Sequence, residues 1–554
     1  MRTAAKWGVL ALSVAMWCGG FVAGPLQPAS ASVDRSGARP GPARFVSVPP
    51  SRILDTRTSG RALAAGGQVK VLAAGAFGVG VNATSLVVNI TATETQGPGF
   101  VTAWNGETVR PLASNLGVEH AGHTVSNLAT VPVGLDGSFT VYVSVGSHIV
   151  LDVFGFYEPA QSGASGRLTT LAPGRVFDSR TDGGRRTPGS TTRIGLSPAI
   201  PLSASAAVLN ITIDDASAPG FWTAFPAGSA RPGTANVNVQ ETHQTLANQA
   251  IVPVTGGAVE IYSQTGGHLI VDVVGWYSGV TDPVSNVGLY VAVAPTRVLD
   301  TREVGLLNPI EDQLKPRAGW TIEVDYELRL VVPATAQAVA LNATVAYPDL
   351  PGYVTVWAAG TQRPTASSLN AFRRGQVVAN HVISPLGTRG FSMYTQQQAH
   401  LIVDVAGYFT GTPVSSSLAA PNNQVIEKLT HLSIPAMGID RDLRIGLEDA
   451  TLDRGPMRWL FSSEAGELGT MRILGHRASH GAPFLGLGNL AAGDRITLTN
   501  ATGRHVYVVT GSRVVLPNEV MGLADAATAN LQLVACHPIG SAEQRLVVRA
   551  ELVE

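Results

Sequence analysis

The residue types that suit covalent chemistry gather near the C-terminal end of the chain. Cys536 lies in the run Leu-Gln-Leu-Val-Ala-Cys-His-Pro at 531–538, and eight residues separate it from Arg545. His476 stands upstream in the run Leu-Gly-His-Arg at 474–477. A thiol, an imidazole and a guanidinium, each on or beside an apolar strand, are the groups of a thiol acyl-transfer site.

These three groups have complementary tasks in acyl transfer. A free thiol has a pKa of about 8.5, so little of it is thiolate at neutral pH. A neighbouring imidazolium stabilises the thiolate and then protonates a leaving amine. A fixed guanidinium meets the negative charge that develops on the former carbonyl oxygen.

Strand periodicity predicts how these groups are positioned. In 531–536, Leu531, Leu533 and Ala535 fall on one face, and Gln532, Val534 and Cys536 on the other. The loop between Cys536 and Arg545 suits two antiparallel strands, which would bring the guanidinium beside the thiol. His476 ends a third strand. The predicted strands of this β-barrel, which has no strong helix, are 428–434, 471–474, 495–499, 505–509, 512–516, 531–535 and 546–552.

At this point the residues resemble a sortase, most closely the class E sortases of actinobacteria. The motifs stand in the family's order at 433–440, 475–477, 481–484, 493–494, 536–538 and 541–545. The resemblance covers 424–554 and implies an eight-stranded sortase β-barrel. It implies that Cys536 is the nucleophile, His476 the acid/base, and Arg545 the oxyanion or substrate stabiliser.

The resemblance also implies a reaction and its partners. Cys536 would cleave the Thr–Gly bond of an LPxTG-like or LAxTG-like sorting signal on an exported protein. An amine of a peptidoglycan precursor, or a pilin lysine, would then resolve the thioester. The enzyme would need no cofactor and no metal. The chain departs from the family pattern at Gln532 and Ala535, where threonines are usual.

Several alternatives compete with this interpretation. His480, His505 and His537 are rival bases, of which His480 is the strongest because it shares a loop with His476. His476, His480 and Cys536 are also zinc-ligand types, although no fourth ligand is evident. A buried, inert cysteine is a further alternative. The second function class is a surface-binding or structural protein whose sortase-like domain is not catalytic.

The region from 44 to 411 repeats three times, with a period of about 120 residues. Each copy holds many short β-branched runs split by Gly, Pro and Asn, which predicts a β-sandwich or small barrel. The copies resemble a repeat of actinobacterial surface proteins. Their shared motifs are Arg-x-x-Asp-[Thr/Ser]-Arg at 52–57, 175–180 and 297–302, Asn-x-Thr at 89–91, 210–212 and 342–344, and a closing His-x3-Asp at 148–152, 268–272 and 400–404.

The His-x3-Asp pair could be a metal or catalytic site, because residues i and i+4 of a strand share a face. The favoured interpretation is a buried polar pair joined by the opening Arg-x-x-Asp-x-Arg, since buried charges persist when paired. The Asn-x-Thr triplets match glycan acceptors, but their recurrence on one strand favours packing. The repeats are therefore expected to bind or to space, with a wall glycan as one open partner.

Composition and the N-terminus set the compartment. Residues 1–31 predict a signal peptide, with an uncleaved anchor as the alternative, so the rest is extracytoplasmic. A net charge of −1 gives no electrostatic case for nucleic acid. The predicted all-β organisation is 1–31 leader, 44–158, 166–279 and 288–411 β repeats, 412–423 linker and 424–554 sortase-like domain.

Overall fold

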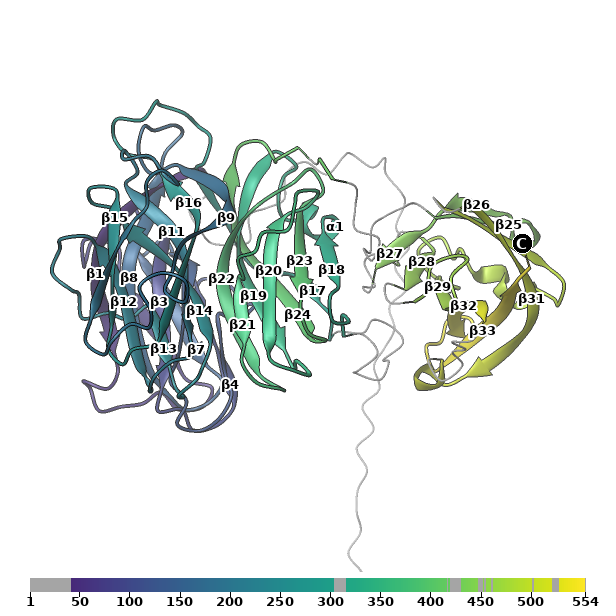
Figure 1. Ribbon diagram of the computed structural model, residues 1–554. Coiled ribbons are helices and arrows are strands. Elements are labelled where there is room, and N and C mark those ends of the chain that lie inside the picture. Colours follow the sequence, from purple (N-terminus) through teal and green to yellow (C-terminus); the bar gives the residue numbers. More distant parts are fainter. Residues whose placement is uncertain are drawn as a thin grey trace, which may run out of the picture. The chain divides into compact units, whose positions relative to one another are not determined.

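A computed structural model describes residues 41–302, 315–415, 417–418, 430–446, 452, 455–459, 462–500, 503–520 and 528–553. The leader predicted at 1–31 lies outside these residues, as does much of the linker predicted at 412–423. The described chain is built from strands, with one four-residue α-helix, α1 (Tyr326–Arg329), and short 3-10 turns (Figure 1). None of the described helices is long and apolar enough to cross a bilayer. The predicted all-β class is confirmed.

The first three groups of eight strands each form two rows of four strands, and we refer to these groups as repeats 1, 2 and 3. One row of repeat 1 and one row of repeat 3 are joined edge to edge into a single eight-stranded sheet. In repeat 1 the sheets run β1-β8-β3-β6 and β2-β7-β4-β5. The strands are β1 (Ala43–Asp55), β2 (Gln68–Leu72), β3 (Ser85–Thr93), β4 (Gly99–Trp104), β5 (Leu116–Val118), β6 (Val125–Pro132), β7 (Ser138–Val143) and β8 (His148–Pro159). Side chains of both sheets share one buried apolar cluster, so the unit is a β-sandwich.

Repeats 2 and 3 have the same topology. Repeat 2 contains β9 (Leu168–Asp178), β10 (Thr191–Gly195), β11 (Ala206–Asp214), β12 (Gly220–Pro226), β13 (Val237–Val239), β14 (Leu246–Pro253), β15 (Ala258–Ser263) and β16 (His268–Tyr277). Repeat 3 contains β17 (Tyr290–Asp300), β18 (Thr321–Val324), β19 (Ala336–Ala346), β20 (Gly352–Ala358), β21 (Leu369–Ala371), β22 (Val377–Pro385), β23 (Phe391–Thr395) and β24 (His400–Thr410).

A second apolar core is shared among the three repeats. Strand β3 is buried along its whole length because its alternate residues serve two cores. Leu86 and Val88 pack inside the sandwich of repeat 1, whereas Val87 joins a cluster with residues of repeats 2 and 3. In that cluster the Tyr157 ring stacks on Tyr290 of repeat 3 with centroids 4.2 Å apart. The repeats therefore bury apolar surface against one another.

The asparagines of the Asn-x-Thr triplets close a cycle of hydrogen bonds between the repeats. The Asn89 amide of repeat 1 donates to the Ala235 carbonyl of repeat 2 at 2.7 Å. Asn210 of repeat 2 donates to a carbonyl of repeat 3, and Asn342 of repeat 3 donates to a carbonyl of repeat 1. All three asparagines are buried, which supports the packing interpretation of these triplets.

The charged motifs of each repeat also find partners within the fold. Arg52 donates to Asp152 on β8 at 2.9 Å and to Asp55 at 3.2 Å. His148 Nδ1 lies 3.0 Å from the Thr56 hydroxyl, which also accepts the backbone N–H of residue 149. The same contacts recur in repeats 2 and 3. These contacts favour the structural interpretation of the His-x3-Asp pair over a shared metal or catalytic site.

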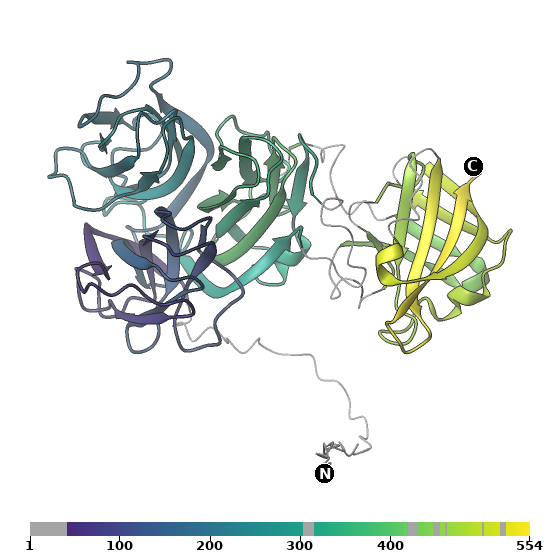
Figure 2. The same cartoon turned by 90° about the horizontal axis from the view of Figure 1, so that it is seen from below.

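The C-terminal strands form one curled sheet, which has the half-barrel form of the predicted β-barrel and includes the three-residue β27 among its nine described strands (Figure 2). The order is β26-β25-β30-β31-β33-β32-β29-β28-β27. The strands are β25 (His431–Ile434), β26 (Ile439–Asp442), β27 (Arg444–Gly446), β28 (Met457–Trp459), β29 (Gly469–Leu474), β30 (Arg495–Asn500), β31 (Gly503–Val515), β32 (Ala529–His537) and β33 (Gln544–Leu552). The 3-10 turns are η2 (Pro435–Met437), η3 (Leu485–Asn489) and η4 (Pro517–Glu519).

Candidate active site

Strands β32 and β33 bring Cys536 and Arg545 together. The two strands are antiparallel, and their register sets Cys536 directly opposite Arg545. Leu533 and Ala535 belong to one buried apolar cluster, whereas Val534 belongs to a different one. The predicted alternation of faces along β32 is therefore confirmed. Cys536 itself is half-buried at the strand end and is a free thiol.

Strand β29 delivers His476 to the same place. This strand runs parallel to β32, with Leu474 paired to Val534. The Gly475 N–H then donates to the Val534 carbonyl at 3.1 Å, which extends the ladder up to His476. Position 475 requires glycine, because a Cβ there would lie 2.5 Å from the ring of the buried Phe484. The Phe484 N–H donates to the His476 carbonyl at 2.9 Å and closes the intervening loop.

The three predicted site residues line one small, open pocket. Its lining consists of Leu452, Leu474, Gly475, His476, Val534, Ala535, Cys536 and Arg545. The wall is thus apolar except for one thiol, one imidazole and one guanidinium. An acyl group entering this pocket would meet a nucleophile, a proton carrier and a cation together.

Arg545 is held rigidly for a long side chain. It is 3% exposed, and its Nη1 donates to the Ala542 carbonyl at 2.8 Å and to the Gln544 carbonyl at 2.9 Å. Ala542 lies in the turn that precedes β33, and Gln544 is the first residue of that strand. Because the guanidinium is fixed before any ligand arrives, little reorganisation is needed to oppose a developing negative charge.

The rival histidines lie outside the pocket lining. His480 is exposed, and its ring lies 4.8 Å from that of His476. His505 contacts Asn500 at 3.2 Å, whereas His537 lies 3.3 Å from Arg477 Nη1. No group of three His, Cys, Asp or Glu side chains with metal-site spacing occurs among the residues that the structure describes.

Arg477 is a positioning residue that the sequence reasoning quoted only as part of a motif. Its side chain is buried, and its Nη1 donates to the Cys536 carbonyl at 3.4 Å. A buried guanidinium beneath the strand end helps to fix the backbone that carries the thiol. The available signal for this role was its position directly after His476 in the loop that follows β29.

The two departures from the family pattern have different structural settings. Gln532 is buried and accepts a hydrogen bond from Arg472 Nε at 3.1 Å across the β29–β32 pair. Burial lowers the pKa of Arg472 to about 10, so a polar partner matters there. Ala535 lines the pocket and packs in the apolar cluster with Leu533. Gln532 thus supports the sheet, while Ala535 alters the pocket wall.

Comparison with known proteins bears on this geometry. Residues 432–553 match the family model described as a sortase domain. For this region the resemblance predicted from the motifs is confirmed. The class E form and the family of the three repeats stay predictions. We therefore call the C-terminal part the sortase-like domain. No curated protein matches the chain.

Solved sortase structures are also similar to the chain. Sortase C1 of pilus island 1 from group B Streptococcus is 24% identical, with a TM-score of 0.22 over 23% of this chain and 66% of that chain. The chain thus spans slightly less than two thirds of that structure. A sortase D5 transpeptidase from Clostridium perfringens is 22% identical, with a TM-score of 0.22 over 23% of this chain and 79% of that chain.

Proposed function

We propose that the sortase-like domain is a cysteine transpeptidase in which Cys536 is the nucleophile, His476 the acid/base and Arg545 the oxyanion stabiliser. The observation that carries the proposal is their common pocket, with Cys536 and Arg545 opposite each other in register. The family match at 432–553 supports a sortase-type transpeptidase in general.

The first half of the proposed reaction forms a thioester. The Cys536 thiolate attacks the Thr carbonyl carbon of a sorting signal of the LPxTG or LAxTG kind. The carbonyl oxygen becomes an oxyanion next to the Arg545 guanidinium. The Thr–Gly bond then breaks, and the departing Gly amine takes a proton from the His476 imidazolium.

The second half transfers the acyl group. An amine from a peptidoglycan precursor or a pilin lysine attacks the thioester carbonyl and gives a proton to His476. The C–S bond breaks, and the thiolate is restored. The sum is exchange of one amide bond for another, so no cofactor or oxidant is needed. Apolar walls around the three groups reduce competition from water.

The rest of the chain fits an extracytoplasmic enzyme. In this proposal 1–31 exports or anchors the chain, 412–423 is a spacer, and 424–554 carries the catalysis. The segments 44–158, 166–279 and 288–411 bind or space without catalysis. Support comes from their charged motifs, whose arginine and aspartate side chains are paired within each repeat.

A second candidate function is non-catalytic binding of sorting-signal peptides. The observation that favours it is Ala535, which replaces a hydroxyl by a methyl group in the pocket wall. Under this alternative the peptide would occupy the pocket without acylating Cys536.

A thioester assay separates the two functions. The full chain is incubated with LPxTG and LAxTG peptides, and its intact mass is measured with and without hydroxylamine. We expect a hydroxylamine-sensitive adduct that is lost in Cys536→Ala. The matched control is His480→Gln, which should retain the adduct. Peptide binding without any adduct, in a folded chain, would replace the enzyme proposal by the binding one.

A further inference from the structure

The three repeats contact one another at three junctions that share the same asparagine contact. The other side chains at the junctions differ. At junction 1 the Arg-x-x-Asp-x-Arg motif of repeat 1 meets a loop of repeat 2. There Arg52 Nη2 donates to the Gly233 carbonyl at 3.2 Å, beside the Asn89 contact. Junction 2 joins repeats 2 and 3 in the same way, and junction 3 joins repeats 3 and 1.

Junction 1 contains an open pocket of about 230 Å³. Both repeats contribute to it. Its lining consists of Arg52, Arg57, Thr91, Thr93, Thr124, Val150, Asp152, Phe221, Gly233, Thr234, Ala235 and Asn238. The wall thus offers hydroxyl, amide and guanidinium groups around one aromatic ring.

Arg57 keeps an open hydrogen-bonding edge in this pocket. Its Nε and Nη2 donate to Asp55 at 2.9 and 2.7 Å. Its Nη1 makes no hydrogen bond to any residue that the structure describes, and the side chain is 45% exposed. A guanidinium edge of this kind is suited to a carboxylate or phosphate oxygen.

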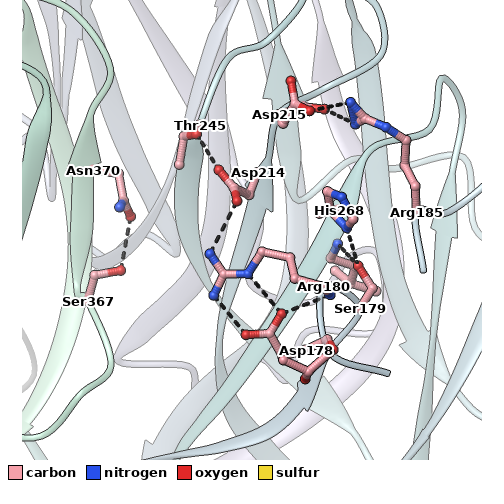
Figure 3. A network of polar contacts seen from close by, with 12 residues as sticks. Asp178, Ser179, Arg180, Arg185, Asp214, Asp215, Thr245, His268, Ser367 and Asn370 are labelled. Atoms are coloured by element: carbon pink, nitrogen blue, oxygen red, sulfur yellow. Dashed lines mark hydrogen bonds and ion pairs between the residues drawn. The ribbon is translucent and has the colours of Figure 1, made fainter. Parts of the chain in front are cut away.

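At junction 2 a protein carboxylate already occupies the corresponding edge. Arg180 is the counterpart of Arg57, and its Nη1 donates to Asp214 at 3.2 Å (Figure 3). Asp214 also accepts from the Thr245 hydroxyl at 2.6 Å. In repeat 1 the position of Asp214 is Thr93, since the two residues pair with the corresponding histidines His268 and His148. Junction 2 therefore supplies internally the anion that junction 1 lacks.

Junction 3 lacks two of the polar groups. The counterpart of Thr93 there is Ala346, which pairs with His400. The counterpart of Asn238 is Gly117, because each is the strand partner of the aromatic residue after the Pro-Gly motif, Phe221 or Phe100. Junction 1 alone combines the open arginine edge with Thr93 and Asn238.

The remaining lining groups suit a sugar ring. Phe221 is half-buried at the pocket and can pack against an apolar ring face. The Thr234 hydroxyl is buried and has no hydrogen-bond partner among the described residues. Asn238 Nδ2 donates to the Ser126 hydroxyl at 2.9 Å. This hydrogen bond fixes the orientation of the Asn238 amide and therefore of its carbonyl oxygen.

We propose that junction 1 binds a saccharide that carries a carboxylate, with the ring against Phe221 and the acid group on the open edge of Arg57. The repeats would then hold the chain at an acidic glycan, independently of whether the sortase-like domain is catalytic. Junction 2 is closed internally by Asp214, and junction 3 lacks the groups that correspond to Thr93 and Asn238.

A matched pair of sugars tests the proposal on the full chain. N-acetylmuramic acid and N-acetylglucosamine share one ring and differ by a lactyl carboxylate. Titrations followed by saturation-transfer NMR should give a dissociation constant for the acid that is at least about tenfold lower than for the neutral sugar. Equal affinities, or no binding of either sugar to the folded chain, would overturn the proposal.

Charge exchange between the junctions supplies the decisive variants. Thr93→Asp places the carboxylate of junction 2 into junction 1, a side chain that the equivalent fold of repeat 2 accommodates. Thr93→Asp should raise the dissociation constant for N-acetylmuramic acid at least about tenfold, and Arg57→Gln should have the same effect. The control Asp214→Thr should keep the affinity within about twofold. If Thr93→Asp binds like the unmodified chain, or if Asp214→Thr weakens binding equally, the assignment to junction 1 is wrong.

Discussion

The repeats and the sortase-like domain use arginine in different ways: in ion pairs within each repeat, and in the lining of a pocket in the sortase-like domain. In repeat 1 the carboxylates of the charged motif are saturated, since Arg52 joins Asp152 and Asp55, and Arg57 takes the rest of Asp55. In the sortase-like domain, Arg545 is tied to backbone carbonyls, and no side-chain carboxylate lines its pocket. Arg545 therefore differs from Arg52 in that it lines a pocket beside a thiol and an imidazole.

This difference shows which observations separate a structural cluster from a candidate site. His148 and Asp152 share a strand face, yet each has its own partner and the set recurs three times. His476, Cys536 and Arg545 come from three strand ends and converge once on a pocket. Sequence spacing alone would make His148 and Asp152 the better candidate site. The convergence of three side chains on one pocket instead favours His476, Cys536 and Arg545.

Replacement of the thiol should give the largest effect. Cys536→Ala removes the nucleophile, so transpeptidation should fall by about 10⁴-fold or more. Because Cys536 is half-buried and its thiol makes no hydrogen bond to a residue that the structure describes, the unfolding temperature should hardly change. Peptide turnover and thermal unfolding, measured on one preparation, check the predicted loss of activity and the predicted unchanged stability. Residual turnover near that of the unmodified chain would show that the pocket is not the catalytic one.

The two neighbouring histidines, His476 and His480, provide the next test. His476→Gln should lower the rate by about 10² to 10⁴-fold through loss of general acid–base catalysis. His480→Gln, in the same loop but exposed and outside the pocket lining, should lower it less than about tenfold. Steady-state rates across pH 5 to 9 distinguish the two, because only the acid/base variant should flatten the profile. A larger loss in His480→Gln would exchange the two roles.

Arg545→Lys tests whether the planar guanidinium is needed in addition to its positive charge. Lysine keeps the cation but cannot donate to two carbonyls and a ligand in one plane. We expect a fall in rate of about 10² to 10³-fold, mainly in kcat, as for loss of an oxyanion donor. Kinetics at saturating peptide provide the measurement. If the lysine variant retains its rate but loses stability, Arg545 has a structural role like that of Arg52.

The pairing of Cys536 with Arg545 was predictable because the two residues are close in sequence. The apolar alternation around Cys536 fixes the face of the thiol, and the short loop to Arg545 fixes the antiparallel register. The role of Arg477 was missed, since its contact with the Cys536 carbonyl joins residues 59 apart. A motif names such a residue but does not say that its side chain turns beneath the neighbouring strand.

The fold was predictable within each unit and much less so between units. Strands expected at 505–509 and 512–516 form one strand, β31, because a register shift between Val509 and Gly511 is absorbed as a bulge. The cycle of asparagine contacts joins residues 146 to 228 positions apart, which no local pattern encodes. The recurrence of Asn-x-Thr on one strand indicated packing but not its partner.

Opening one asparagine contact tests whether the repeats are a cooperative body. Asn210→Ala removes a donor from a buried carbonyl of repeat 3 and should reduce the free energy of unfolding by about 1–3 kcal/mol. Thioester formation at Cys536 should be unaffected. Denaturant unfolding with intact-mass detection of the adduct measures both. If the adduct disappears while the repeats stay folded, the two regions are coupled and the comparison fails.

Acid should affect the repeats through their paired carboxylates. A hydrogen bond from Arg57 lowers the pKa of Asp55 from 3.8 to about 2, and Arg180 does the same for Asp178. Since these pKa values are lower in the folded than in the unfolded state, the stabilisation is complete above about pH 4 and is lost as the pH falls toward 2. In calorimetry, the unfolding transition of the repeats is identified as the one that Asn210→Ala destabilises. The midpoint of that transition should be lower at pH 3 than at pH 6. In Asp55→Asn that shift should be smaller, because one of the titrating groups is gone. An equal shift in Asp55→Asn would mean that other carboxylates govern the acid sensitivity.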